Sequence, residues 1–124
     1  MATPVVYGYI RTATEDPAGV LEYRAAIEVL CAREGWELGA VFQDVGSPLD
    51  AEGRPGFRGL LDAAAMPRTT AVVLVDSTHL SPRPAMQAEL AARICRTGAA
   101  VTVVHGAVPE PDHRHETHGG PGVQ

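Results

Sequence analysis

Four short runs of β-branched, apolar and aromatic residues alternate with three helical patterns, and this alternation limits the possible folds more than any other feature. Such runs, bounded by Gly, Pro and Asp, predict buried strands. Strands that alternate with helices predict a parallel sheet with helices on both faces. We therefore expect an α/β domain of three layers, with a four-stranded, mostly parallel sheet flanked by helices. The predicted strands are residues 5–10, 36–43, 71–75 and 100–104.

Capping residues mark the ends of the predicted helices. Residues 18–34 carry apolar side chains at helical spacing. Asp16 is suited to the N-cap of this helix and Pro17 to its first position, while Gly35 supplies a stop. A second helix is expected to begin at Pro55.

Length and charge narrow the functional classes. We expect a single domain over residues 1–106 and a disordered tail rich in Pro, Gly and His over residues 107–124. The formal charge of −5 argues against tight, autonomous binding to DNA. All basic side chains apart from histidine are arginines. The lack of lysine excludes a Walker A loop, a Schiff-base enzyme and a phospho-receiver site.

The carboxyl end of the first predicted strand is a candidate anion site. Arg11 is the first charged residue after this strand, and strand ends of this kind face the ligand crevice of open α/β sheets. Only a short loop separates Arg11 from Asp16, where a helix N-terminus would favour an anion. Ala13, in this loop, has no hydroxyl with which to attack a substrate.

The segment Tyr9-Ile10-Arg11-Thr12-Ala13-Thr14 resembles the start of the serine recombinase catalytic domain, the resolvase and invertase family, which reads Tyr-x-Arg-Val-Ser-Thr. The resemblance covers residues 5–106, and its ordered set of matches is more specific than any single tripeptide. Further matches, in order, are Ala32-Arg33-Glu34-Gly35-Trp36, Phe42-Gln43-Asp44, Gly46-Ser47, Arg54-Pro55-Gly56-Phe57, Leu60-Leu61, Ala71-Val72-Val73-Leu74-Val75 and Leu80-Ser81. We therefore expect a resolvase-like fold.

The resemblance implies a particular chemistry. In this family a serine attacks a DNA phosphodiester to give a 5′-phosphoserine linkage and a free 3′-hydroxyl, while several arginines stabilise the charged intermediate state. Ala13 stands at the nucleophile position. Arg11 and Arg54 match family arginines and are the candidate phosphate-binding residues. Asp44 and Tyr9 are candidate supporting residues.

The second half of the implied site is degenerate. The family reads Leu-Asp-Arg-Leu-Ser/Gly-Arg after the third strand, and here Thr78 replaces the Asp, His79 the first Arg and Pro82 the second Arg. Tyr23 replaces a glutamine of the first helix. Since the nucleophile and two cationic groups are absent together, we predict a protein related to DNA recombination and strand exchange that is catalytically inactive. We expect no cofactor and no metal.

Arg11 and its neighbours also have structural interpretations. Arg11 could pair with Asp44 or Asp76 at the edge of the sheet instead of holding a phosphate. Thr12 and Thr14 carry hydroxyls, but residues adjacent to the nucleophile position point elsewhere. A rescued nucleophile is therefore disfavoured.

Other polar residues favour structural roles. His79 is interpreted as a surface loop histidine and Ser81 as a loop or helix-cap hydroxyl. Cys31 and Cys95 lie in apolar helical patterns, where a free cysteine behaves as a small core residue. The tail histidines favour a solvated segment over a metal site, because no cysteine accompanies them. They are His113, His115 and His118.

Partners and location follow from the same features. Family members continue into a long dimer-forming helix and a separate DNA-binding module, so we expect a truncated relative. The candidate partners are DNA, bound weakly, an intact recombinase, or a second copy of the chain. The alternative function is a regulatory or phosphate/nucleotide-binding module that pairs with an intact recombinase. No signal peptide or membrane-length apolar run occurs, which predicts a cytoplasmic protein without a membrane partner.

Overall fold

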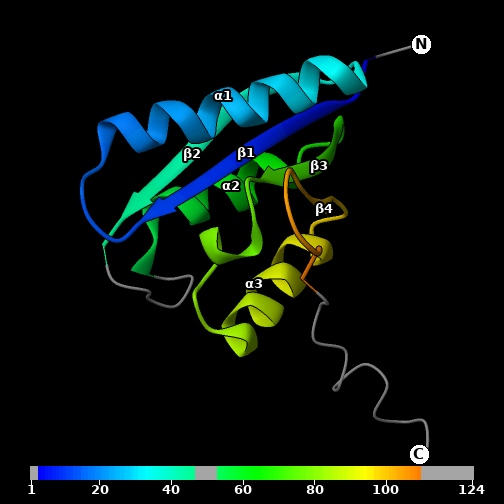
Figure 1. Cartoon of the computed structure of the whole chain (residues 1–124). Coiled ribbons are helices and arrows are strands. Elements are labelled where there is room, and N and C mark those ends of the chain that lie inside the picture. The colour runs from blue at the N-terminus through cyan, green and yellow to red at the C-terminus, as the bar shows by residue number, and fades with distance from the viewer. Residues whose placement is uncertain (1–2, 47–52, 110–124) are drawn as a thin grey trace, which may run out of the picture.

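The computed structural model describes residues 3–46 and 53–109. Strands and helices alternate along the chain as the sequence predicts (Figure 1). The elements are β1 (Val5–Thr12), α1 (Pro17–Glu34), β2 (Glu37–Val45), α2 (Pro55–Ala64), β3 (Thr69–Leu74), the 3-10 turn η2 (Ser77–His79), α3 (Pro84–Arg96) and β4 (Ala100–Val103).

The four strands form one sheet in the order β2-β1-β3-β4, and every neighbouring pair is parallel. The predicted α/β architecture is therefore confirmed. The chain moves from β1 outward to β2, then crosses back over β1 to β3. The order thus reverses between β1 and β3, which places a topological switch point at their carboxyl ends.

Helix α1 covers one face of the sheet (Figure 1). Ile27 and Leu30 of α1 pack with Val6 and Val73 in a buried apolar cluster on that face. Gly8 of β1 permits this approach, since a Cβ at Gly8 would lie 3.2 Å from Ile27 Cδ1. The central strand can therefore lie close beneath the helix.

Helices α2 and α3 cover the opposite face (Figure 1). Phe57 and Leu60 of α2 and Leu90 of α3 belong to a second buried cluster with Tyr9 of β1. The Tyr9 and Phe57 rings meet edge to face, with centroids 5.5 Å apart. Both faces of β1 are thus buried, which explains the apolar and aromatic residues of this strand.

The strand boundaries differ from the predicted ones by a few residues. β1 continues two residues beyond its predicted end, because Arg11 pairs with Asp44 and Thr12 with Val45 across the β1–β2 ladder. Arg11 is therefore the penultimate residue of the strand and does not follow it. The Arg11 backbone is fixed by the sheet on one side.

The ends of α1 agree with the sequence analysis. Asp16 is the N-cap, and its side chain accepts a hydrogen bond from Gly19 N at 3.1 Å. Pro17 opens the helix, and Gly35 ends it with a φ of 76°. The left-handed conformation at Gly35 explains the choice of glycine there.

The two cysteines behave differently. Cys31 is buried in the cluster beneath α1, as predicted, whereas Cys95 is exposed. The prediction for Cys95 is wrong because Leu90 and Ile94 supply the buried face of α3 and Cys95 falls on its outer side. The predicted tail from residue 110 onward, with its three histidines, and Ser47 lie outside the described residues.

Candidate functional site

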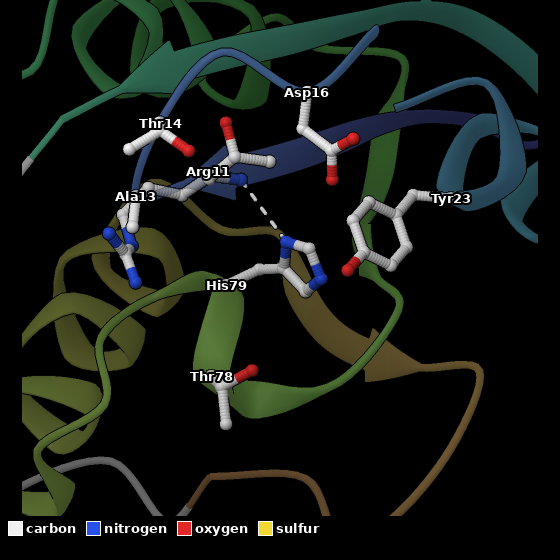
Figure 2. Close-up of a pocket in the computed structure, with 8 residues that line it drawn as sticks. Arg11, Ala13, Thr14, Asp16, Tyr23, Thr78 and His79 are labelled. Atoms are coloured by element: carbon white, nitrogen blue, oxygen red, sulfur yellow. Dashed lines mark hydrogen bonds between the residues drawn. The ribbon is translucent and has the colours of Figure 1, made fainter. Parts of the chain in front are cut away.

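A cavity of about 290 Å³ opens at the carboxyl ends of β1 and β3, where the strand order reverses. Ligands bind at this position in open α/β sheets. Most of its walls come from the end of β1, the loop that follows, and the η2 turn after β3 (Figure 2). The lining residues are Arg11, Thr12, Ala13, Thr14, Asp16, Tyr23, Thr78 and His79.

His79 is buried, so the prediction of a surface loop histidine is wrong. Only 4% of the residue is exposed, because η2 turns it beneath the end of β1. Its Nδ1 accepts a hydrogen bond from Arg11 N at 3.1 Å (Figure 2). Its ring meets that of Tyr23 edge to face, with centroids 4.6 Å apart. The histidine thus joins β1, η2 and α1 at the cavity.

The hydrogen bond to Arg11 N defines the protonation of His79. A ring nitrogen that accepts a hydrogen bond carries no proton, so the single proton resides on Nε2. Burial lowers the pKa of His79, and the Arg11 charge acts in the same direction, while Asp76 opposes the shift. His79 is therefore a neutral hydrogen-bond donor near pH 7.

Arg11 keeps part of its hydrogen-bonding capacity. Its Nη1 donates to the Gly46 carbonyl at 3.1 Å. Within residues 3–46 and 53–109, Arg11 forms an ion pair with neither Asp44 nor Asp76, and its buried Nε has no hydrogen-bond partner. The Thr12 hydroxyl is likewise buried without a partner in this part of the chain. Arg11 Nε and the Thr12 hydroxyl therefore have no hydrogen-bond partner among the described residues.

Asp44 is committed to the fold. Its Oδ1 accepts from Gly56 N at 2.7 Å, and its Oδ2 accepts from Phe57 N at 2.8 Å and from the Tyr9 hydroxyl at 2.6 Å. Gly56 and Phe57 belong to the first turn of α2, whose amides have no partner within the helix. Asp44 therefore caps α2 from the end of β2. Burial raises the pKa of the Tyr9 hydroxyl, and the hydrogen bond to Asp44 raises it further.

Arg54 lies apart from the cavity. The residue is 2% exposed, and its Nη1 donates to the Leu80 carbonyl. It is not among the residues that line the cavity around Arg11. The structure therefore brings Arg11 and His79 together and places Arg54 between α2 and the chain that follows η2.

The other positions that depart from the family pattern, Thr78 and Pro82, lie in different places. Thr78 lines the cavity, and its backbone N donates to Asp76 Oδ1 at 2.9 Å. Pro82 is exposed outside the cavity lining. The Ser81 side chain is fully buried and accepts a hydrogen bond from Arg83 N at 3.1 Å. Ser81 thus organises the turn into α3.

Asp16 and Tyr23 were not identified from the sequence as parts of one site. The sequence placed Asp16 at a helix N-terminus near the candidate anion site and Tyr23 at a family glutamine position, but it gave no reason to pair them. Both line the cavity, on the side of His79 away from the Arg11 guanidinium (Figure 2). Asp16 and Tyr23 are seven residues, or about two helical turns, apart. This distance along the helix gives only weak evidence from the sequence that the two side chains share a site.

Comparison with protein families gives a match to the family described as Resolvase, N terminal domain, over residues 6–118. The chain belongs to this family. Comparison with curated protein sequences gives no match. The resolvase-family assignment therefore rests on the family match, which covers most of the chain.

Solved structures show the same fold. The catalytic domain of ISC1926 TnpA, an IS607-like serine recombinase, is 18% identical with a TM-score of 0.68, over 82% of this chain and 71% of that one. The catalytic domain of TP901-1 integrase is 17% identical with a TM-score of 0.69, over 81% and 76%. That of IS1535 TnpA, also IS607-like, is 23% identical with a TM-score of 0.61, over 87% and 73%.

Within the described residues, no group of three or more His, Cys, Asp or Glu side chains is arranged to hold a metal ion. Among the helices of the described ranges, none has the length and apolar character needed to cross a membrane.

Proposed function

We propose that this resolvase-family domain serves DNA recombination by holding a phosphate group without cleaving the bond next to it. The observation that carries the proposal is Ala13, which lines the cavity beside Arg11 (Figure 2). A methyl group offers no electron pair for attack on phosphorus. Arg11 retains the charge and donors that suit a phosphate oxygen.

Neighbouring hydroxyls are poor replacements for the missing nucleophile. The Thr12 hydroxyl is buried, and the Ser81 hydroxyl accepts from the backbone away from the cavity. Thr14 is exposed and lines the cavity, but no hydrogen bond to a base is found for it within the described residues. An unactivated threonine hydroxyl is a weak nucleophile near neutral pH.

The charges around the cavity also favour binding over cleavage. Among the described residues that line it, Arg11 is the only arginine, and Asp16 contributes an opposing negative charge. His79 adds a hydrogen-bond donor but no charge near pH 7. Phosphoryl transfer depends on several cationic groups, and loss of one such donor costs on the order of a hundredfold to a thousandfold in rate.

Incubation with supercoiled plasmid DNA tests this proposal. The unchanged protein should give no covalent protein–DNA adduct and no nicks. Ala13→Ser alone should also be inactive, because Thr78, neutral His79 and Pro82 leave the phosphate short of stabilising charge. Denaturing gel electrophoresis after rapid quenching measures both products, and an intact serine recombinase with its own site is the positive control.

Two results would contradict the proposal in different ways. An adduct from the unchanged protein that disappears when Thr12, Thr14 and Ser81 become alanine would reveal a replacement nucleophile. Efficient nicking by Ala13→Ser would show that the remaining groups suffice for cleavage and that only the hydroxyl is missing.

A further inference from the structure

The cavity is larger than a phosphate group requires. Its volume of about 290 Å³ is close to the lower end of the range for small-molecule pockets, which is about 300–1,000 Å³. A phosphate with four oxygens fills only a fraction of this space. The remaining volume is sufficient for several carbon atoms attached to the phosphate.

The polar groups of the cavity differ from one side to the other. The Arg11 guanidinium lies near Ala13 on one side of His79, whereas Asp16 and Tyr23 lie on the other (Figure 2). A guanidinium attracts an anion, and a carboxylate accepts hydrogen bonds from hydroxyl or amino groups. A complementary ligand therefore carries an anion at one end and hydrogen-bond donors at the other.

Asp16 retains acceptor capacity while it caps α1. Its Oδ1 accepts from Gly19 N at 3.1 Å, whereas an ionised carboxylate has about four acceptor sites. Gly19 has no side chain beside this carboxylate, and a Cβ there would lie 2.1 Å from Asp16 Oδ2. Asp16 is exposed, and no hydrogen bond to its Oδ2 is found within the described residues, so this oxygen is available to a ligand.

Two unpaired polar atoms at the end of β1, one on each face of the strand, also indicate a ligand. The Thr12 residue is 8% exposed, and its hydroxyl is buried without a partner within the described ranges. Arg11 Nε is also buried and has no hydrogen-bond partner within the described ranges. Buried polar groups are normally hydrogen-bonded, so a phosphate near Arg11 could accept from its Nε, and another polar group of the same ligand could pair with the Thr12 hydroxyl.

We propose that the cavity binds a small phosphate monoester whose carbon skeleton carries hydroxyl groups, such as a pentose 5-phosphate or a nucleoside 5′-monophosphate. The phosphate lies on the Arg11 side, and the hydroxyls donate to Asp16. The neutral His79 donates from Nε2 to an oxygen between the two ends. This inference rests on the proposed phosphate site and adds the class of molecule that fills it.

Nuclear magnetic resonance titration with inorganic phosphate, ribose 5-phosphate and ribose tests the inference. A hydrogen bond to a charged group contributes about 1.5–3 kcal/mol, so ribose 5-phosphate should bind about tenfold or more tightly than phosphate. Asp16→Asn should remove most of this advantage while phosphate binds at least as well. Arg11→Gln should weaken binding of both phosphorylated compounds.

Matched variants separate these effects from general changes in charge or stability. Arg58→Gln and Asp62→Asn alter exposed residues of α2, away from the cavity, and should bind like the unchanged protein. Asparagine is also a good N-cap, so Asp16→Asn should preserve α1, which a thermal melt can verify.

The outcomes distinguish this inference from the proposed function. Equal affinity for phosphate and ribose 5-phosphate would overturn the inference and leave the phosphate site intact. Binding of neither compound would overturn both. Because the 5′ end of a DNA strand also carries a phosphate monoester, a 5′-phosphorylated tetranucleotide is a further probe. Binding of this probe without binding of ribose 5-phosphate would overturn the small-molecule assignment.

Discussion

At the scale of single residues, the buried His79 links folding to pH. The pKa of His79 is lower in the folded chain than the usual value of about 6.5. Below pH about 6.5, His79 is protonated in the unfolded chain but stays largely neutral in the folded chain until the pH reaches its lower folded-state pKa. We therefore expect the free energy of unfolding to fall as the pH is lowered from about 7 through 6.5, down to the folded-state pKa.

His79→Asn isolates this effect. Asparagine can present Oδ1 to Arg11 N in place of Nδ1 but does not titrate. Urea unfolding at a series of pH values should show a smaller loss of stability on acidification in the variant. His105→Asn, at an exposed position, should keep the original dependence. Identical slopes for the unchanged protein and His79→Asn would show that His79 is not the titrating group.

Residue patterns pointed to the strand end where the cavity lies but not to the contacts within it. Arg11 and Ala13 were located because a strand end followed by a short loop is a local feature. The burial of His79 depends on the Arg11 amide, which lies 68 positions earlier in the chain. Periodicity contains no information about such a pairing, so a polar residue in a proline-rich loop was assigned to the surface.

At the scale of elements, Asp44 joins β2 to α2. Asp44→Ala would leave the Gly56 and Phe57 amides and the Tyr9 hydroxyl without this acceptor. Because hydrogen bonds to a charged group contribute about 1.5–3 kcal/mol each and act here as a unit, we expect a loss of about 2–4 kcal/mol in unfolding free energy. Chemical denaturation measures it.

An exposed carboxylate on the same helix provides the control for Asp44. Asp62→Ala should change stability by no more than about 0.5 kcal/mol, as is usual for surface substitutions. A comparably small effect of Asp44→Ala would mean that water or a neighbouring group replaces the cap without loss.

The segment Arg54-Pro55-Gly56-Phe57 shows why an ordered motif can be recognised before its role is understood. Its resemblance to the family suggested a phosphate-binding loop. In the structure a Cβ at Gly56 would lie 2.3 Å from the Gln43 carbonyl oxygen, so glycine is required for the approach of α2 to β2. Arg54 is buried against the Leu80 carbonyl. The motif therefore has a packing role that its sequence alone does not reveal.

At the scale of the whole molecule, the alternation of strands and helices was sufficient to predict a parallel sheet covered on both faces. The strand order matters for the candidate site because it places the ends of β1 and β3 side by side, where the cavity lies. The net charge acts at the same scale. With a formal charge of −5, the chain as a whole repels DNA, and any attraction has to come from a local group such as Arg11.

Salt dependence of DNA binding tests this balance. Each neutralised phosphate of duplex DNA contributes a slope of about −0.9 to a plot of log K against log salt concentration. If Arg11 supplies the single phosphate contact, binding should be weak, with a slope near −1, and Arg11→Gln should bring the slope close to zero. Fluorescence anisotropy with a labelled duplex measures it. Arg58→Gln, which removes an equal charge from α2, should keep the slope, whereas a steep slope in the unchanged protein would require an extended basic surface and contradict a single-phosphate site.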